Sequence, residues 1–231
     1  MNIKPVKKEH RFERVLIIAG GTSLCGVDLS GTVDFDGAII TVNNVINHIP
    51  RADFWFTVDP TIQRKPQLAM LNQRFGTYYY TAQPDIEKEP HIAEWYPIVK
   101  GIHYLERIVP TDAQQYILQE EKDKITTGDS VYGALGLAYH FEAKQIILLG
   151  VDAYGHGHFY DKNDPYNGRN QKASKFKEYL NNIPKIYEQS VAQLQKRGVQ
   201  VINGSPMSRV ECFERVSPET ALDIALKGGI L

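Results

Sequence analysis

The chain has 231 residues, of which 42% are hydrophobic and 23% charged, and its formal net charge is -1. This length and composition fit one domain with a sizeable core, and they exclude a broadly basic surface for generic adhesion to nucleic acids or membranes. No apolar run is long enough to span a membrane, so we expect a soluble cytoplasmic protein, or one associated with membranes only peripherally.

The first 36 residues contain a charged start and a small-residue turn. Residues 1–13 predict a flexible basic arm, followed by a single domain over residues 14–231. Arg14–Ala19 is a short apolar strand that runs into the turn Gly20–Ser23, which reads GGTS. The backbone N–H groups and two hydroxyls of this turn could hold an anionic or nucleotide ligand, although the same residues suit a plain strand-to-helix turn.

Two more apolar strands follow, and each ends in a polar residue. Gly37–Val42 ends in Asn43, and Phe54–Val58 ends in Asp59. Because the carboxyl ends of parallel strands share one edge, these residues and the GGTS turn would line one rim of a sheet. Asn and Asp are also common in ordinary turns, which is the alternative interpretation.

The middle of the chain gives a weaker signal. Thr77–Thr81 predicts a fourth strand. Residues from about 83 to 123 predict a less regular insertion, rich in aromatic residues, with a short helix over Ala113–Glu121. Such a segment could cover a site or form an ordinary loop layer.

Lys124–Asp161 carries the strongest pattern. Thr126–Gly128 predicts the start of a helix, with a hydroxyl able to cap its first N–H groups. Gln145–Leu149 predicts a strand that is buried on both faces. The loop after it, GVDAYGHGHFY, is rich in Gly, His and Tyr, and this position in open α/β sheets is where ligands bind.

The last third alternates in the same way. Asp161–Lys177 predicts a loop beside the site, Tyr179–Arg197 an amphipathic helix, Val199–Ile202 a strand, and Pro218–Leu226 a terminal helix. The alternation predicts an α/β fold with a single doubly wound, mostly parallel, Rossmann-like sheet, which is a variant of the GT-A type.

The order of these segments resembles bacterial sialyltransferases of the lipooligosaccharide type. The segments are VLIIAGGTSL, the strand ends at Asn43 and Asp59, KITTG, KQIILLGVDAYGHGHFYD and VQVINGS. Their order is also similar to the Rossmann-like group around the archaeal 6-hydroxymethylpterin diphosphokinases. The resemblance runs from about Val15 to Ser205, with Gln83–Asp123 unmatched. It implies an inverting glycosyltransferase that uses a nucleotide-activated sugar, most of all a CMP-linked sugar. The sugar would be transferred to a hydroxyl of a glycan or a modified nucleic acid.

The resemblance also implies roles for particular residues. The donor phosphate and ribose would be held by Gly20, Gly21, Thr22 and Ser23. Donor hydroxyls or the base would be contacted by Asn43 and Asp59. The residues beside the donor would be Thr127 and Gly128, and those capping the nucleotide pocket would be Asn203, Gly204 and Ser205. The departing phosphate would be bound by Tyr154 and Tyr160, and the residue at the family's arginine position is Lys124.

The acceptor hydroxyl needs a general base. The family's histidine lies in a stretch that corresponds here to Asp161–Ile186, which contains no histidine. His156 or His158 would therefore serve, since imidazole titrates near neutral pH, and Asp152 would orient one of them or cap the strand end.

Three alternatives remain open at this point. Asp152, His156 and His158, or Asp59 with Asp152 and His156, could bind a divalent metal in a diphosphokinase- or phosphohydrolase-like enzyme. The chain could instead be a nucleotide-binding protein without catalysis. It could also form a homo-oligomer.

Overall fold

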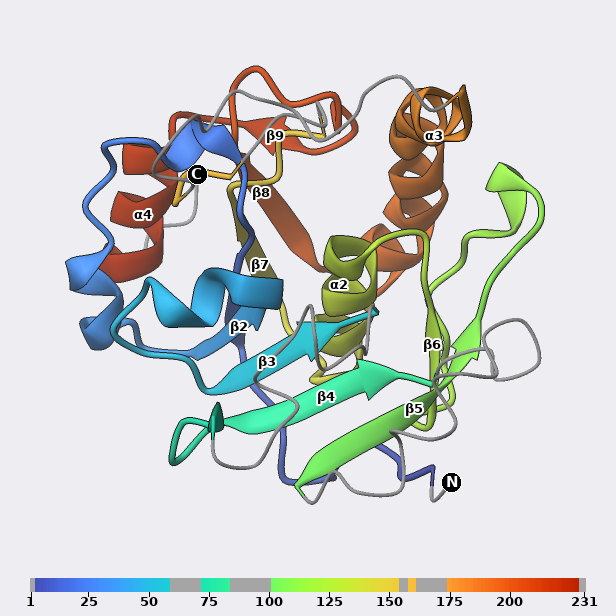
Figure 1. Ribbon diagram of the computed structural model, residues 1–231, viewed down its shortest axis with the longest axis horizontal. Helices are drawn as coiled ribbons and strands as arrows, with labels where there is room; N and C mark the ends of the chain where they lie inside the picture. Colours follow the sequence, from blue (N-terminus) through green and yellow to red (C-terminus); the bar gives the residue numbers. More distant parts are fainter. Residues whose placement is uncertain (1–2, 59–71, 84–100, 154–157, 161–173, 229–231) are drawn as a thin grey trace.

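The computed structural model describes residues 3–58, 72–83, 101–153, 158–160 and 174–228, and for 174–180 the backbone alone. Nine strands within these ranges form one sheet, in the order β6-β5-β4-β3-β2-β1-β7-β8-β9, and all their pairings are parallel (Figure 1). The predicted α/β fold with a single, mostly parallel sheet is confirmed. The strands are β1 (Arg14–Ile18), β2 (Ala38–Val42), β3 (Phe54–Thr57), β4 (Tyr78–Ala82), β5 (Ile102–Ile108), β6 (Lys124–Thr126), β7 (Gln145–Leu149), β8 (Gln200–Gly204) and β9 (Glu214–Arg215).

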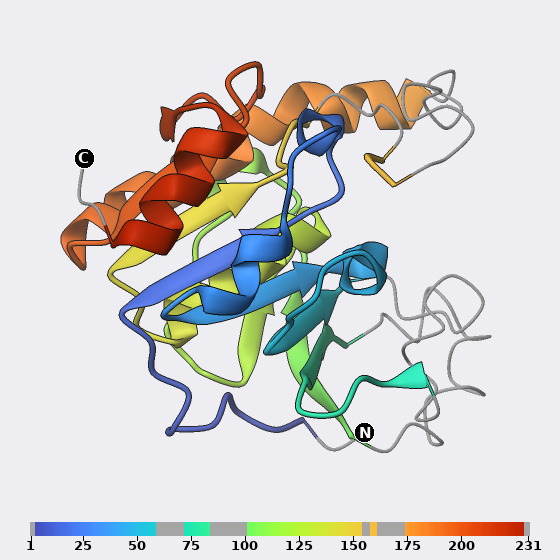
Figure 2. The same ribbon diagram turned by 90° about the vertical axis from the view of Figure 1, so that its left-hand side faces the viewer.

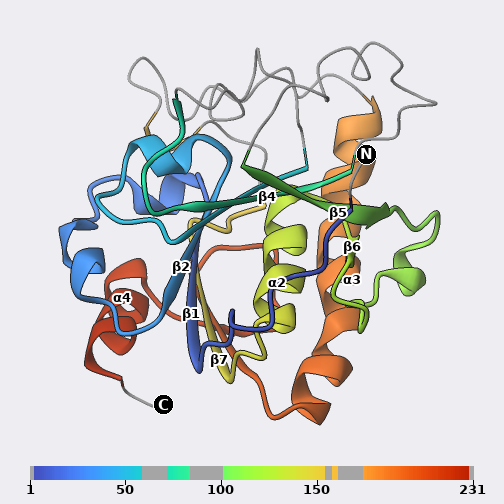
Figure 3. The same cartoon turned by 90° about the horizontal axis from the view of Figure 1, so that it is seen from below.

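Helices cover both faces of the sheet. The α-helices of the described ranges are α2 (Ser130–His140), α3 (Ser174–Lys196) and α4 (Pro218–Lys227). Helices α2 and α3 pack on one face, and α4 packs on the other with the short 3-10 helices η1 (Thr22–Leu24), η2 (Ser30–Asp34) and η3 (Asn43–Asn47) (Figure 3). Figure 2, viewed from the α4 side, shows this helix on the near side of the strands. None of the helices in the described ranges has the length and apolar character needed to cross a lipid bilayer.

Strand β7 shows why the sheet needs both layers. Its side chains alternate, so that Ile146 and Leu148 join the core on the α2 face while Ile147 and Leu149 join the core on the α4 face. All five residues of β7 are buried. A strand covered on both sides has no polar face, which explains the continuous apolar run in its sequence.

The strand order reverses between β1 and β7. The chain adds β2 to β6 one after another on one side of β1, and then places β7 and β8 on the other side. Open α/β sheets bind their ligands at the carboxyl ends of the strands at such a switch point. Here those ends are the segments 19–23 and 150–153.

Helix α2 lies within the curve of the sheet and contacts β1, β2, β3 and β6 (Figure 1). Small residues permit the close approach: a Cβ on Gly133 would lie 2.4 Å from the Phe56 ring. The helix begins at Ser130 with Asp129 as its cap, whose carboxylate accepts the Tyr132 N–H at 2.7 Å. The predicted start at Thr126 is therefore wrong, because Lys124–Thr126 pairs with β5 as a strand.

Part of the predicted insertion belongs to the sheet. Strand β5 pairs with β4 and with β6, and the short helix predicted at Ala113–Glu121 is a single 3-10 turn over Ala113–Gln115. β5 has only two fully buried positions, Tyr104 and Leu105, so its sequence lacks the apolar run that identified the central strands.

The predicted solvated arm is packed against the domain over residues 3–13. The Lys4 N–H bonds to the Tyr104 carbonyl at 3.2 Å and the Val6 N–H to the Lys122 carbonyl at 2.8 Å. Within this segment Val6 and His10 are buried, and Phe12 packs against the core on the α2 face. These side chains dock the segment on the domain.

Candidate functional site at the carboxyl ends of the strands

Asp152 organises the switch point. Its carboxylate accepts hydrogen bonds from the Ser23 N–H at 2.8 Å, the Ser23 hydroxyl at 2.5 Å and the Ser205 hydroxyl at 2.5 Å. The Thr22 hydroxyl adds a longer contact at 3.3 Å, and the two serine oxygens lie 2.7 Å apart. One carboxylate thus joins the ends of β1, β7 and β8.

This geometry changes what the GGTS turn can offer to a ligand. The Ser23 N–H is used by Asp152 and the Gly21 N–H by the Gly150 carbonyl at 2.8 Å. A hydroxyl that donates to a carboxylate keeps its own lone pairs for accepting. The cluster of Thr22, Ser23 and Ser205 around Asp152 therefore presents hydrogen-bond acceptors, which suit ribose hydroxyls or an exocyclic amine better than a phosphate.

The turn is also close-packed. A Cβ on Gly21 would lie 2.4 Å from the Gly150 carbonyl oxygen and 2.6 Å from the Asp152 carboxylate. Gly150 itself has φ +68° and Ala153 φ +58°, in the left-handed region that is strained for a non-glycine residue. Such strain gathers at ligand sites more than elsewhere.

Asn43 ties the rim to helix α2. It also has a left-handed backbone, with φ 58°. Its side-chain oxygen accepts from the Thr57 hydroxyl at 2.8 Å and the Ser130 hydroxyl at 3.4 Å, and its carbonyl accepts from the Trp55 indole at 2.6 Å. The side-chain NH₂ is then the part of Asn43 suited to donate to a ligand.

Thr127 and Gly128 lie on the same rim, between β6 and α2. The Thr127 hydroxyl accepts from Arg107 Nε at 2.8 Å, and Arg107 comes from the carboxyl end of β5. Gly128 lies against Tyr116, whose pKa is raised by burial and by the nearby Asp129 carboxylate. Thr127 is buried, so contact with a donor would run through its neighbours Arg107 and Gly128.

His158 and Tyr160 form a stack of three rings with His48. The His158 and Tyr160 rings are 4.9 Å apart and nearly parallel, and His48 stacks on the Tyr160 ring at 4.4 Å with an interplanar angle of 3°. The Phe159 N–H donates to the Gly20 carbonyl at 3.0 Å. The stack therefore lies directly over the β1 turn.

The three residues expected to cap the nucleotide pocket divide into two groups. Asn203 and Gly204 are buried within β8, where a Cβ on Gly204 would meet Ala221 of α4 and Leu149, each at 2.7 Å. Their environment is that of the core and the α4 packing. Only Ser205 reaches the Asp152 cluster.

Lys124 lies away from this rim. It begins β6, at the opposite end from Thr127, and its ammonium is 3.5 Å from Glu121. The His140 ring bonds to its carbonyl at 2.8 Å. The expectation that Lys124 faces a departing phosphate conflicts with this position, because the strand direction carries its start to the amino-end side of the sheet.

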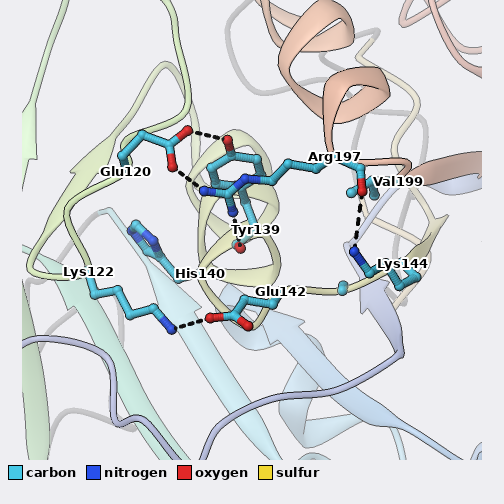
Figure 4. Close-up of a pocket in the computed structure, with 9 residues that line it drawn as sticks. Glu120, Lys122, Tyr139, His140, Glu142, Lys144, Arg197 and Val199 are labelled. Carbon is cyan, nitrogen blue, oxygen red and sulfur yellow. Dashed lines mark hydrogen bonds and ion pairs between the residues drawn. The ribbon is translucent and has the colours of Figure 1, made fainter.

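A pocket of about 250 Å³ also lies on that amino-end side (Figure 4). Its ion pairs are Arg197 with Glu120 and Lys122 with Glu142 at 2.9 Å, and the Lys144 ammonium donates to the Arg197 carbonyl at 3.3 Å. The Arg197 guanidinium covers the Tyr139 ring at 3.6 Å. This pocket joins the last turns of α2 and α3 and is remote from the switch point, so we do not take it as the functional site.

Asp59, Tyr154 and His156 lie outside the described residues. Within the described part of the chain, His, Cys, Asp and Glu side chains do not gather in threes as a metal site would require. The metal alternatives therefore stay predictions that depend on Asp59 and His156.

Two solved structures share this fold. The Campylobacter jejuni sialyltransferase CstII in complex with the substrate analogue CMP-3FNeuAc matches with a TM-score of 0.52 and 15% identity over 95% of this chain and 89% of that chain. A sialyltransferase CST-II variant in complex with CMP matches with a TM-score of 0.54 and 16% identity over 94% and 89%. The chain has the fold of these sialyltransferases. No protein-family model matches it, and no curated protein does.

Within this sialyltransferase-like fold, the sequence analysis missed four rim residues. Arg107 and Ser130 follow from β5 and the true start of α2, neither of which was predicted. Arg209 donates its backbone N–H to the Asp152 carbonyl at 3.1 Å and its guanidinium to Asn181 of α3 at 3.2 Å. His48 comes from the turn after η3. Arg107 and Ser130 had no signal because their elements were not predicted with these bounds, and Arg209 and His48 had none because loops and turns bring them to the rim.

Proposed function

We propose that this protein is a glycosyltransferase that uses a nucleotide-activated sugar, with a CMP-linked sugar as its donor. The observation that carries the proposal is the hydroxyl–carboxylate cluster at the switch point, formed by Ser23, Asp152 and Ser205. It occupies the place where open α/β sheets bind ligands, in a fold shared with solved sialyltransferases, one of them in complex with CMP.

The nucleoside would bind at this cluster. Both serine hydroxyls donate to the Asp152 carboxyl group and can accept from a ligand. Ribose hydroxyls and the cytosine amine are the donors of a cytidine nucleotide, so they complement this surface. The NH₂ of Asn43, at the end of β2, would donate a hydrogen bond to an oxygen of the nucleotide sugar.

The phosphate would be held by groups other than the turn. The amides of Gly21 and Ser23 are already paired. Arg209, whose N–H bonds to the Asp152 carbonyl, and Arg107, at the carboxyl end of β5, carry guanidinium groups at the same edge of the sheet. Hydrogen bonds from arginine to phosphate are charge-assisted and about twice as strong as neutral ones. Tyr160, together with Tyr154, would donate to the phosphate as it leaves.

The transfer itself would be a direct displacement. The acceptor oxygen forms a bond to the anomeric carbon while the bond from that carbon to the phosphate oxygen breaks, and CMP leaves with the electron pair. A base takes the acceptor proton, and this role falls to His158 or His156. His158 lies beside Gly20 at the end of β1, within reach of the proposed donor site.

Titration calorimetry tests the nucleotide proposal. We expect CMP to bind more tightly than UMP, UDP or AMP, and Ser205→Ala to weaken CMP binding. The absence of binding by every nucleotide would overturn the proposal. Transfer or hydrolysis of a CMP-sugar, followed as CMP release, would then separate an enzyme from a binding protein.

Chelation separates this function from the metal-dependent alternative. CMP release should persist in excess EDTA, because none of the proposed steps uses a metal. Loss of activity on chelation, with release of AMP or pyrophosphate from ATP, would instead favour the diphosphokinase- or phosphohydrolase-like enzyme.

A further inference from the structure

The two sides of the three-ring stack differ in how firmly they are mounted. His48 follows η3, where its N–H bonds to the Val45 carbonyl at 2.8 Å. Its neighbours Ile46 and Ile49 are buried in the core on the α4 face, and Arg74 donates to both of their carbonyls, at 2.6 and 3.1 Å. The backbone that carries His48 is therefore anchored on both sides.

The other side is the loop after β7. Phe159, His158 and Tyr160 are half-buried, and the backbone contact of this short segment with β1 is the Phe159 N–H bond to Gly20. A Cβ on Gly20 would lie 2.7 Å from the His158 ring and 3.3 Å from the Tyr160 ring. The rings lie close against backbone that carries no side chain, and Tyr160 also packs against the core on the α4 face, so contacts between the rings contribute to their position.

We propose that His48 is a positioning residue that fixes Tyr160 over the β1 turn. The Tyr160 ring lies between two imidazoles, with His158 from its own loop and His48 from the turn after η3. Of these two imidazoles, His48 is the one whose flanking residues are buried in the core on the α4 face. Flat groups at about van der Waals distance on both faces fix the plane of the phenol ring and hence the direction of its hydroxyl.

This inference rests on the proposed function, in which Tyr160 donates to the leaving phosphate. A donor aimed in advance at developing charge stabilises it without reorganising at the moment of reaction. His48 would supply that aim from a segment other than the one that carries the tyrosine. It would also make the loop after β7 sensitive to η3, which begins at Asn43, the residue proposed to contact the nucleotide sugar.

The test compares His48→Ala with His48→Phe, which keeps a flat ring and removes both nitrogens. The first readout needs no ligand: hydrogen exchange at the Phe159 amide. An aromatic pair contributes a factor of about 3 to 10, so we expect His48→Ala to speed this exchange by about that factor and His48→Phe to restore it. Phe75→Ala, at a fully exposed aromatic residue, is the control.

The second readout is CMP affinity and, with a CMP-sugar, the rate of CMP release. We expect His48→Ala to lower both and His48→Phe to recover both. Unchanged exchange and affinity in His48→Ala would overturn the inference, and so would a His48→Phe variant that behaves like His48→Ala. Wild-type protein that binds no nucleotide would overturn the proposed function instead, while the exchange data would still decide whether His48 holds the loop.

Discussion

Replacing Asp152 by alanine removes a carboxylate that joins the ends of β1, β7 and β8. Four donors lose their partner: the N–H and hydroxyl of Ser23 and the hydroxyls of Thr22 and Ser205. The hydroxyls can turn toward water or toward each other, since the two serine oxygens are already 2.7 Å apart. The Ser23 N–H has no such freedom.

A hydrogen bond to a charged group contributes about 1.5–3 kcal/mol, and bonds that share one carboxylate do not add fully. We therefore expect Asp152→Ala to lower the free energy of unfolding by about 3–4 kcal/mol. At about 2–4 °C per kcal/mol for a domain of this size, the melting temperature should fall by roughly 10 °C. Asp152→Asn should lower the stability by only about 1 kcal/mol, because its NH₂ can donate to the two serine oxygens once these hydroxyls rotate.

Thermal unfolding followed by circular dichroism measures both variants. Asp223→Ala is the matched control, because that carboxylate forms an exposed pair with Lys227 on α4, and such pairs contribute about 0–1 kcal/mol. The reasoning fails if Asp152→Ala melts as Asp223→Ala does. It also fails in part if Asp152→Asn is as unstable as Asp152→Ala, since that would make the charge, and not the hydrogen-bond pattern, decisive.

Three further predictions follow from other contacts. Gly21→Ala should lower stability by about 1–3 kcal/mol in urea titrations and abolish CMP binding in calorimetry, because its Cβ would meet a backbone oxygen at 2.4 Å. Burial, and secondarily the Lys7 ammonium, lowers the pKa of His10 from 6.5 to about 4, so between these pH values the unfolded chain binds the proton more readily than the folded chain. The free energy of unfolding should therefore fall by up to about 3 kcal/mol as the pH drops from 6.5 to 4. His10→Gln should flatten that profile. Arg107→Ala and Arg209→Ala should each weaken CMP about 10-fold or more in calorimetry, whereas Lys124→Ala should leave the affinity unchanged.

These three predictions have separate points of failure. Normal CMP binding by Gly21→Ala would show that the segments 19–23 and 150–153 can move apart without loss of the site. A flat stability profile between pH 6.5 and 4 in the wild type would mean that His10 is not buried as a neutral imidazole. An effect of Lys124→Ala equal to that of Arg107→Ala would restore the sequence-based role of Lys124.

The central strands could be predicted because burial on two faces leaves a clear trace in the sequence. Gln145–Leu149 was predicted with the bounds that the structure shows, and Arg14–Ile18 and Ala38–Val42 each differ by one residue at one end. Strands β5 and β6 were missed, because a short or half-buried strand mixes charged and apolar residues. The residue patterns therefore defined the middle of the sheet and not its edge.

The candidate site was predictable only in part, for a related reason. Ser23 and Asp152 follow directly from strand ends, and the structure brings them together with Ser205. Arg209 and His48 reach the rim through loops and turns, whose paths depend on tertiary contacts. Whether these residues bind a nucleotide stays a prediction for the experiments above.

The amino-end side of the sheet holds the docked segment 3–13 and the paired charges around Arg197. The rim at the carboxyl ends of the strands, in contrast, carries strained backbone at Asn43 and Ala153. This separation should make the protein tolerant of substitutions at the candidate site. Reinforcing substitutions on one side of the sheet can offset destabilising ones on the other, so the residues of the candidate site can change widely while the scaffold stays intact.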